Sequence, residues 1–220
     1  MQRIPGFLTR DECLAASRAI EVARADWVPA FDKEQFSLGR AWYTHYEEDR
    51  SREYFARAAE SDAIVERHLP GMQQRVIDLV ARVSGGRGER RTGWCGPGVH
   101  IFPAGECVSE SGGVVHFDTE GLPARHLRAR KPALTLLVML QAPERGGGIR
   151  LWEARYSGSD HASDEDLEAP SELIEYAEGE AIVFDSYRLH QIQPFTGSRD
   201  RYTLTGHAAA VDRDLWQVWF

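Results

Sequence analysis

The sequence has no long hydrophobic run and few cysteines. No stretch of about 20 consecutive apolar residues occurs, so we expect no membrane-spanning helix. The first six residues, Met1–Gly6, lack the apolar segment of a signal peptide. Cys13, Cys95 and Cys107 are an odd number of cysteines, lie far apart and form no Cys-x-x-Cys pair. We therefore expect reduced thiols in a cytoplasmic protein.

Positive charge is also scarce. The chain carries 26 Lys and Arg residues against 34 Asp and Glu residues, a formal net charge of −8. Nucleic-acid binding needs a basic surface that displaces the counterions of the phosphates. The sequence shows no convincing basic patch, so we expect no nucleic-acid partner. A hydrophobic content of 42% and a length of 220 residues fit a globular protein with a substantial core.

The first part of the chain, to about residue 90, predicts helices with one or two strands. Thr9 and Glu12 have capping-box spacing, and apolar residues at helical spacing follow. This pattern predicts a helix that ends before Pro29. The aromatic stretch 31–50 predicts one or two strands.

Residues 50–83 predict two helices separated by Pro70-Gly71. The glycine-rich stretch Gly85–Gly88 follows and is the only candidate domain boundary. We interpret residues 1–220 as one domain, with a helical part over 1–90 and a β-rich core over 91–210.

From about residue 90 the hydrophobic period changes to two residues, which is typical of β-strands. Turn signals rich in Gly and Pro separate the predicted strands, and no long helix intervenes. This arrangement predicts a β-barrel or sandwich. The predicted strands are Thr92–Phe102, Gly113–Phe117, Leu134–Gln141, Ile149–Glu153, Glu180–Asp185 and Tyr202–Ala208.

A long acidic insertion over residues 154–177 separates two of these strands. It is rich in Ser, Asp and Glu, and Ser171–Tyr176 predicts a short helix. Long loops at the mouth of a β-barrel are often lids, whereas others are solvated surface. The sequence leaves both interpretations open.

The segment Val114–Asp118 contains a His-x-Asp pair. Residues two apart on a strand project to the same side, so His116 and Asp118 can face one cavity. His190, some seventy residues later, is the candidate third ligand. Two histidines and one carboxylate on one face form the facial triad of non-haem Fe(II) sites, whose open positions admit a bidentate cosubstrate and O2.

A lone His-x-Asp pair is weak evidence. In a chain with eight histidines, one such pair arises by chance about half the time. A rival pair, His45 and Glu47, has His-x-Glu spacing. It lies among the predicted helices and has no obvious distal partner, so the surroundings of His116 decide between the two pairs.

Those surroundings contain two further patterns. The apolar strand Leu134–Gln141 is followed by a glycine turn and the strand start at Gly146–Leu151. Nearer the C-terminus, Gly179–Asp185 is a glycine with an apolar strand, and a histidine, a proline, a glycine and the segment Arg201–Thr205 follow in order. Both patterns resemble Fe(II)/2-oxoglutarate-dependent dioxygenases. The start of the chain, Ile4–Leu8 with its capped helix, resembles the prolyl-4-hydroxylase-like branch of that family.

The resemblance implies a mainly β fold with N-terminal helices, the double-stranded β-helix or jelly roll. It implies Fe(II) held by His116, Asp118 and His190, with 2-oxoglutarate as cosubstrate and O2 as oxidant. In halogenating relatives a small residue replaces the carboxylate ligand. Because Asp118 is present, we expect hydroxylation or another oxidation rather than chlorination.

The resemblance also implies that Arg201 holds the distal carboxylate of 2-oxoglutarate. Thr203 shares a strand face with Arg201 and could donate to the same carboxylate. The interval from His190 to Arg201 is one residue longer than expected, so Arg199 is the second candidate.

The substrate is expected to be a small molecule or an amino-acid type. His100, Trp152 and His126 are candidate substrate contacts, although a structural histidine, a core tryptophan and a solvated loop are the respective alternatives. A different class of protein, a cupin-like metal-binding barrel that does not use O2, needs the same ligands but no cation such as Arg201. Oligomeric state does not follow from the sequence.

Overall fold

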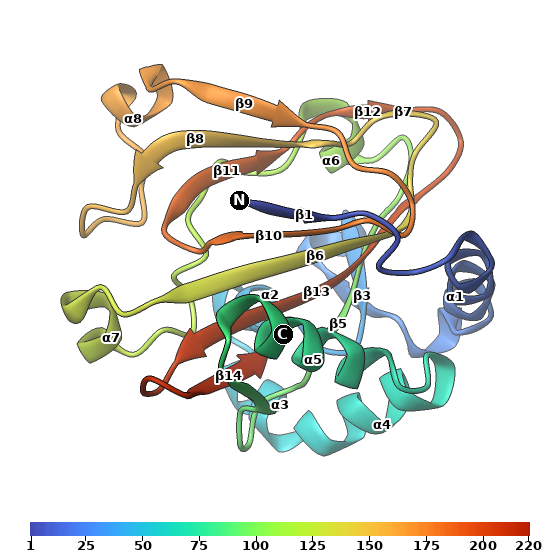
Figure 1. The fold of residues 1–220 in the computed structure, drawn as a ribbon. Helices are drawn as coiled ribbons and strands as arrows, with labels where there is room; N and C mark the ends of the chain where they lie inside the picture. Colours follow the sequence, from blue (N-terminus) through green and yellow to red (C-terminus); the bar gives the residue numbers. More distant parts are fainter.

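The computed structural model describes residues 1–220, which form two facing β-sheets with helices on one side (Figure 1). The larger sheet has nine strands, all antiparallel to their neighbours except one pair. In spatial order they are β1 (Gln2–Ile4), β10 (Ala181–Asp185), β6 (Ala133–Gln141), β13 (Arg201–Ala210), β5 (Gly98–Phe102), β3 (Gln35–Leu38) and β2 (Val28–Ala30), with β14 (Leu215–Trp219) beside β13 and β4 (Arg87–Arg90) parallel to β14.

The smaller sheet, at the top of Figure 1, has three strands. They are β11 (Arg188–Ile192), β8 (Ile149–Arg155) and β9 (Ser171–Ile174), and a separate pair joins β7 (Arg145–Gly146) to β12 (Phe195–Thr196). The chain alternates between the sheets, from β6 to β8, back to β10, across to β11 and back to β13. This alternation confirms the predicted jelly roll, and the sheets do not close into a barrel.

Helices cover the outer face of the larger sheet. α1 (Arg10–Val22) and α5 (Met72–Ser84) pack on it, and α4 (Ala58–His68) contacts both helices. Alternation along β6 explains the packing, since Leu136 and Val138 belong to the same buried cluster as Ile20 and Val80 of the helices. Each such fully buried aliphatic side chain stabilises the fold by about 1.5–3 kcal/mol. The predicted N-terminal capping box of α1 is present.

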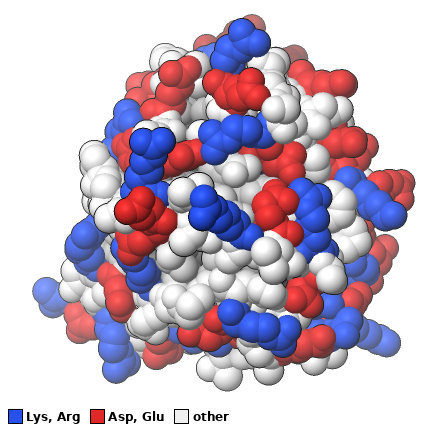
Figure 2. All heavy atoms as spheres, turned by 90° about the vertical axis from the view of Figure 1, so that its right-hand side faces the viewer, with Lys and Arg blue, Asp and Glu red and all other residues white.

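The remaining helices are short. α2 (Trp42–Glu47) and α3 (Ser51–Ala56) precede α4, while α6 (Cys107–Ser111) and α7 (Ala124–Ala129) flank the His-x-Asp segment, α8 (Asp164–Glu168) lies in the acidic insertion, and 3-10 turns cover Arg24–Asp26 and Phe31–Lys33. No helix has both the length and the apolar character that crossing a membrane requires. On the face in Figure 2, acidic and basic side chains are interspersed.

The segment Gly113–Phe117 is not a strand, contrary to the prediction. Only one bridge forms there, between His116 and His190. Gly112 adopts a φ of +81°, and a Cβ at this position would lie 2.7 Å from the Ile192 carbonyl oxygen. Gly112 thus leaves the extended conformation next to β11, and the segment that follows pairs with β11 only irregularly.

Two helix and strand assignments also differ from the predictions. Ser171–Tyr176 begins with strand β9 instead of forming a helix, because pairing with β8 and burial of Ile174 outweigh local preference. Within 31–50, β3 is a strand as predicted, but Trp42–Glu47 is helix α2.

Other boundaries shift. The predicted strand Thr92–Phe102 begins only at Gly98, and residues 50–83 contain three helices rather than two, with the predicted break at Pro70-Gly71. Among the other strands of four or more residues, the sequence patterns missed β4, β11 and β14. Gly85–Gly88 leads directly from α5 into β4, which pairs with β14.

Candidate metal centre

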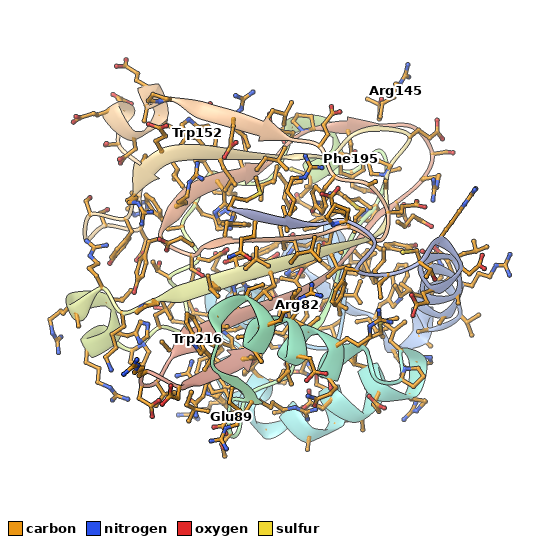
Figure 3. The ribbon with its side chains drawn as sticks, in the orientation of Figure 1. Arg82, Glu89, Arg145, Trp152, Phe195 and Trp216 are labelled. Carbon is orange, nitrogen blue, oxygen red and sulfur yellow. The ribbon has the colours of Figure 1, made fainter.

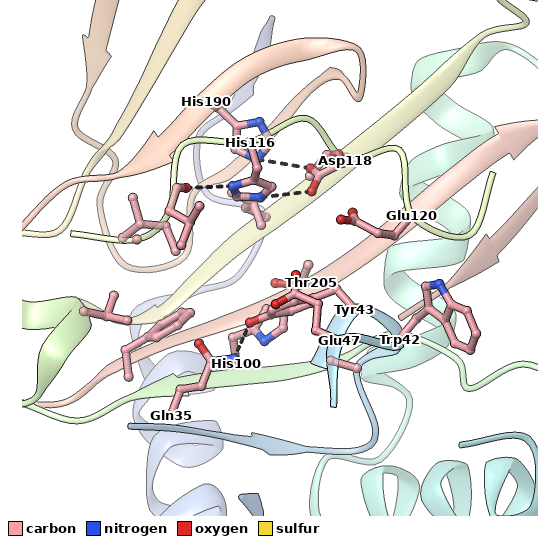
Figure 4. A pocket seen from close by; sticks show the side chains of 18 of the residues that line it. Gln35, Trp42, Tyr43, Glu47, His100, His116, Asp118, Glu120, His190 and Thr205 are labelled. Atoms are coloured by element: carbon pink, nitrogen blue, oxygen red, sulfur yellow. Dashed lines mark hydrogen bonds and ion pairs between the residues drawn. The ribbon is translucent and has the colours of Figure 1, made fainter. Parts of the chain in front are cut away.

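Three side chains from two distant segments converge between the sheets. His190 comes from β11, and His116 and Asp118 come from the adjacent segment before α7 (Figure 4). One nitrogen or oxygen atom from each lies within 4.8 Å of the other two. His116 Nε2 lies 3.3 Å from Asp118 Oδ1, and His190 Nε2 lies 3.2 Å from Asp118 Oδ2.

Backbone hydrogen bonds tie the two segments together. The His116 amide donates to the His190 carbonyl and the His190 amide donates to the His116 carbonyl, both at 3.0 Å. The Asp118 amide donates to the Ser186 carbonyl at 3.0 Å. The convergence of the three side chains is thus fixed by main-chain pairing at the edge of the smaller sheet.

Each ligand is oriented by a second partner. His116 Nδ1 lies 2.8 Å from the Val114 carbonyl oxygen, and His190 Nδ1 lies 3.0 Å from the Arg188 carbonyl oxygen. Because a carbonyl only accepts, both Nδ1 atoms carry a proton, so a metal ion would bind at the two Nε2 atoms in place of any proton there. Thr135 Oγ1 donates to Asp118 Oδ2 at 2.5 Å.

The electrostatics of the triad favour a bound cation. Burial raises the pKa of Asp118, but the nearby imidazoles of His190 and His207 outweigh it and hold the pKa well below its usual range. Burial lowers the pKa of His116, yet the Asp118 carboxylate outweighs this effect and raises it to about 9. Two imidazole nitrogens and one carboxylate on one side form a donor set that fits Fe(II).

Arg201 is fully buried and has no carboxylate partner. Its Nε donates to the Gly147 carbonyl at 2.8 Å, Nη2 to Tyr176 Oη at 2.7 Å and Nη1 to Thr203 Oγ1 at 3.3 Å. Its guanidinium lies 5.7 Å from the centre of the Phe102 ring. All three acceptors are neutral, so the protein leaves a buried positive charge without a counter-charge.

Arg199 occupies a different environment. It is exposed and forms an ion pair with Glu178 at 2.7 Å. It does not line the cavity beside the triad. Of the two candidate arginines, only Arg201 lies beside that cavity, next to Phe102, which lines it.

The triad lines a cavity of about 420 Å³ between the sheets and α2. Leu137 and Ile149 form part of an apolar wall near the triad, and Trp42 and Tyr43 form an aromatic wall on α2. The volume falls within the range of small-molecule sites.

His100 lines this cavity, as one sequence-based interpretation expected. It is 8% exposed, and its Nδ1 has no hydrogen-bond partner. Its ring lies 5.4 Å from that of Tyr43 and 4.7 Å from that of Phe220. Burial lowers the pKa of His100 to about 3, so the ring is neutral.

The other two candidate substrate residues lie outside the cavity. Trp152 packs in a separate apolar cluster with Tyr156 and donates its indole proton to the Leu167 carbonyl at 3.1 Å (Figure 3). His126 lies on α7 with Nε2 at 3.2 Å from the Pro132 carbonyl oxygen. The core-tryptophan alternative describes Trp152, whereas the solvated-loop alternative does not describe His126, which is buried on α7.

The rival pair is separated by the structure. His45 is buried and its ring nitrogens contact Arg40 and the Ala41 carbonyl. Glu47 instead lines the cavity. The two side chains therefore do not converge on a common point.

Three site residues were missed at the sequence level, and a fourth, Glu47, was considered only as a metal ligand. Thr135 orients Asp118, and Tyr176, at the end of the acidic insertion, contacts Arg201. Glu47 and Glu120 line the cavity, and burial raises the pKa of Glu120 to about 7. Alternation along β6 and the two-residue step from Asp118 could have found Thr135 and Glu120.

The fold is similar to those of several solved structures at low sequence identity. SnoK, a non-heme alpha ketoglutarate dependent carbocyclase from nogalamycin biosynthesis, shares 11% identity with a TM-score of 0.61 over 99% of this chain and 91% of that chain. AviO1 from Streptomyces viridochromogenes Tue57 shares 12% with a TM-score of 0.59 over 94% and 87%. An N-substituted L-amino acid dioxygenase from Burkholderia ambifaria AMMD, in complex with alpha-KG, shares 12% with a TM-score of 0.58 over 98% and 84%.

No protein-family model matches the chain, and no curated protein matches it in sequence. At identities of 11–12% the structural likeness shows a common fold. The chemistry of this chain must therefore be argued from its own residues.

Proposed function

We propose that the protein is a non-haem Fe(II)- and 2-oxoglutarate-dependent oxygenase. The observation that carries the proposal is an open facial donor set beside a fully buried arginine that lacks a carboxylate partner. Such a donor set suits Fe(II), and such an arginine suits an anionic cosubstrate. The common fold with enzymes described as alpha ketoglutarate dependent supports the same proposal.

His116, Asp118 and His190 would hold Fe(II). When bound, Fe(II) with 2-oxoglutarate supplies O2 activation coupled to decarboxylation of 2-oxoglutarate to succinate. The chain contributes preorganisation, because backbone carbonyls hold both Nδ1 protons and Thr135 holds one Asp118 oxygen. The three protein ligands would come from one side, which would leave room for cosubstrate and O2.

Arg201 would bind the distal carboxylate of 2-oxoglutarate. Thr203 and Tyr176 already contact its guanidinium, and their hydroxyl groups can turn to donate to a bound carboxylate. A carboxylate there would supply the counter-charge that the protein itself lacks. Arg199 already has Glu178 and is the weaker candidate.

The proposed reaction is hydroxylation of a small-molecule or amino-acid-type substrate. The carboxylate ligand Asp118 supports oxidation over halogenation. Since one similar structure is a carbocyclase, the product must be identified chemically rather than from the fold. Assignment to the prolyl-4-hydroxylase-like branch stays a prediction from Ile4–Leu8 and the helix that follows.

An anaerobic titration of metal-free protein with Fe(II) and 2-oxoglutarate tests the proposal. We expect a visible metal-to-ligand charge-transfer band that needs both components. Bound metal without a band would instead favour the cupin-like metal site that does not use O2.

Variants assign the band to residues. We expect His116→Ala to abolish iron binding and Arg201→Ala to weaken 2-oxoglutarate binding while iron still binds. His161→Ala, an exposed histidine outside the cavity, is the matched control. Unchanged iron content in His116→Ala would overturn the site.

A further inference from the structure

Apart from its histidines, the cavity is lined by acidic side chains without a Lys or Arg. Apart from the ligand Asp118, the carboxylates of Glu34, Glu47 and Glu120 line it, and no Lys or Arg does. Glu120 reaches in from the segment that follows Asp118, and Glu47 comes from the end of α2 (Figure 4). Once Fe(II) neutralises Asp118, a net negative charge remains on the substrate side.

These carboxylates have no partner within the protein. Neither Glu47 nor Glu120 forms an ion pair, although acidic residues elsewhere do, such as Glu180 with Arg3 at 2.6 Å. Glu120 is half-buried, so water compensates it only partly. In the free protein burial raises the pKa of both carboxylates, and the protonated His116 imidazole acts on both in the opposite direction. Once a metal ion takes the place of that proton, a half-buried carboxylate without a Lys or Arg partner is suited to a cation that arrives with a ligand.

Independent of the carboxylates, two other polar side chains in the same cavity lack partners. The Nδ1 atom of His100 and the Nε1 atom of Trp219 are buried without a hydrogen bond, in side chains that are 8% and 1% exposed. Buried polar groups are normally satisfied, and exceptions mark places where a ligand or water completes the site. His100 packs on Tyr43 of α2, so it belongs to the half of the cavity that Glu47 faces.

Aromatic rings surround the same half. Trp42 and Tyr43 on α2 and Trp219 on β14 line the cavity. An ammonium group over such ring faces gains about 0.5–2 kcal/mol, more when water is excluded. Rings and carboxylates together favour positive charge and disfavour negative charge.

We propose that the substrate carries a positively charged amine and no carboxylate or phosphate, and that Glu47 and Glu120 bind the amine. The inference rests on the proposed function, because it concerns the substrate of that site. It narrows the substrate from an amino-acid type to an amine whose other polar groups are neutral. Such groups can hydrogen-bond to the neutral His100 ring and the Trp219 indole.

The arrangement separates the charges of the two organic reactants. The anionic cosubstrate has Arg201, and the cationic substrate has Glu47 and Glu120. A substrate with a free carboxylate would meet two like charges and find no cation in the cavity lining. Like-charge contacts of this kind discriminate against the wrong ligand.

Calorimetric titration of anaerobic protein loaded with Fe(II) and 2-oxoglutarate tests the inference. The probes are benzylamine, benzyl alcohol and benzoate, and butylamine, butanol and butyrate. We expect each amine to bind at least about tenfold more tightly than its alcohol and its carboxylate. Equal or tighter binding of the carboxylates, or no amine binding at millimolar concentration, overturns the inference.

Matched variants locate the effect. Glu47→Gln and Glu120→Gln should each weaken amine binding by about tenfold and leave alcohol binding unchanged. Glu106 is an exposed carboxylate outside the cavity, so Glu106→Gln removes the same charge and should change neither amine affinity nor alcohol affinity. An equal loss in Glu106→Gln would show a long-range charge effect and overturn the assignment.

The charge-transfer band separates the two proposals. If the band forms and the amines show no preference, the proposed function stands and the substrate inference fails. If the band does not form, the same titration on Zn(II)-loaded protein still measures amine preference. That preference would then belong to a metal site of another function.

Discussion

The triad end of the cavity and its α2 side differ in how their polar groups are satisfied. At the triad, both Nδ1 atoms, the Asp118 carboxylate and the backbone amides have partners within the protein. On the α2 side, Glu47 and Glu120 have no ion pair, and His100 Nδ1 has no hydrogen bond.

The difference shows that the protein preorganises the metal site but leaves polar groups on the substrate side without partners. A metal ion needs ligands held in fixed directions before it binds, and a second layer of hydrogen bonds supplies that order. An organic substrate brings its own charged and hydrogen-bonding groups, so the protein can leave polar side chains without internal partners until the substrate binds. The predictions below test whether the two regions behave in these two ways.

Among the further variants, the largest effect is expected for Asp118→Ala at the triad end. Loss of the only carboxylate ligand should weaken Fe(II) binding by more than about 100-fold, measured by anaerobic calorimetry. Asp78→Ala, an exposed carboxylate on α5, is the control. Equal affinity in the two variants would contradict the triad.

Next comes Arg201→Met. It should weaken 2-oxoglutarate binding by about 100-fold, since a buried charge pair is lost. Without cosubstrate, its free energy of unfolding should be unchanged or higher by about 1–4 kcal/mol, because a buried cation without a counter-charge is removed. Chemical denaturation and titration measure the two quantities.

Arg199→Met is the matched control for that variant, since Arg199 is exposed and paired with Glu178. Its cosubstrate affinity should equal that of the unmodified protein. If Arg199→Met instead weakens 2-oxoglutarate binding and Arg201→Met does not, Arg199 is the residue that binds the cosubstrate.

Thr135→Val should have an intermediate effect. It removes the hydroxyl that donates to Asp118 Oδ2 and keeps the shape of the side chain. Metal affinity should fall by about 10- to 100-fold, measured by competition with a chelator. The Thr205 hydroxyl donates to the Thr203 carbonyl and not to a metal ligand, so Thr205→Val should leave the metal affinity unchanged. Equal metal affinities would mean that Asp118 needs no orienting partner.

The smallest effect is expected for Glu120→Gln on stability. Since Glu120 has no ion pair to lose, the free energy of unfolding should change by no more than about 0.5 kcal/mol, measured in urea. Glu180→Gln, which loses its pair with Arg3, should destabilise more. A large loss in Glu120→Gln would mean that the α2 side is structural.

Local pattern predicted much of the fold. The capping box of Thr9 and Glu12, the break at Pro70-Gly71 and the strands over 133–141 and 201–210 follow short-range rules that the structure confirms. The failures lie where distant partners decide. Ser171–Ile174 becomes a strand only because β8 offers an edge, and Gly113–Phe117 pairs with β11 only through an isolated bridge and one further backbone bond.

The sequence by itself determined the donor types and their order along the chain. The spacing of His116 and Asp118, a distal His190 and a following arginine can be seen without coordinates, because they are properties of residue type and interval. The choice between Arg199 and Arg201 could not be made without coordinates, because it depends on which arginine forms an ion pair with Glu178.

Only the tertiary structure decided the substrate side. Glu47 lies in a helix about seventy residues before Glu120, and His100 lies on a third segment. No periodicity links them. They meet because α2, β5 and the segment after Asp118 line one cavity, and their missing partners become apparent only when every neighbour is in place.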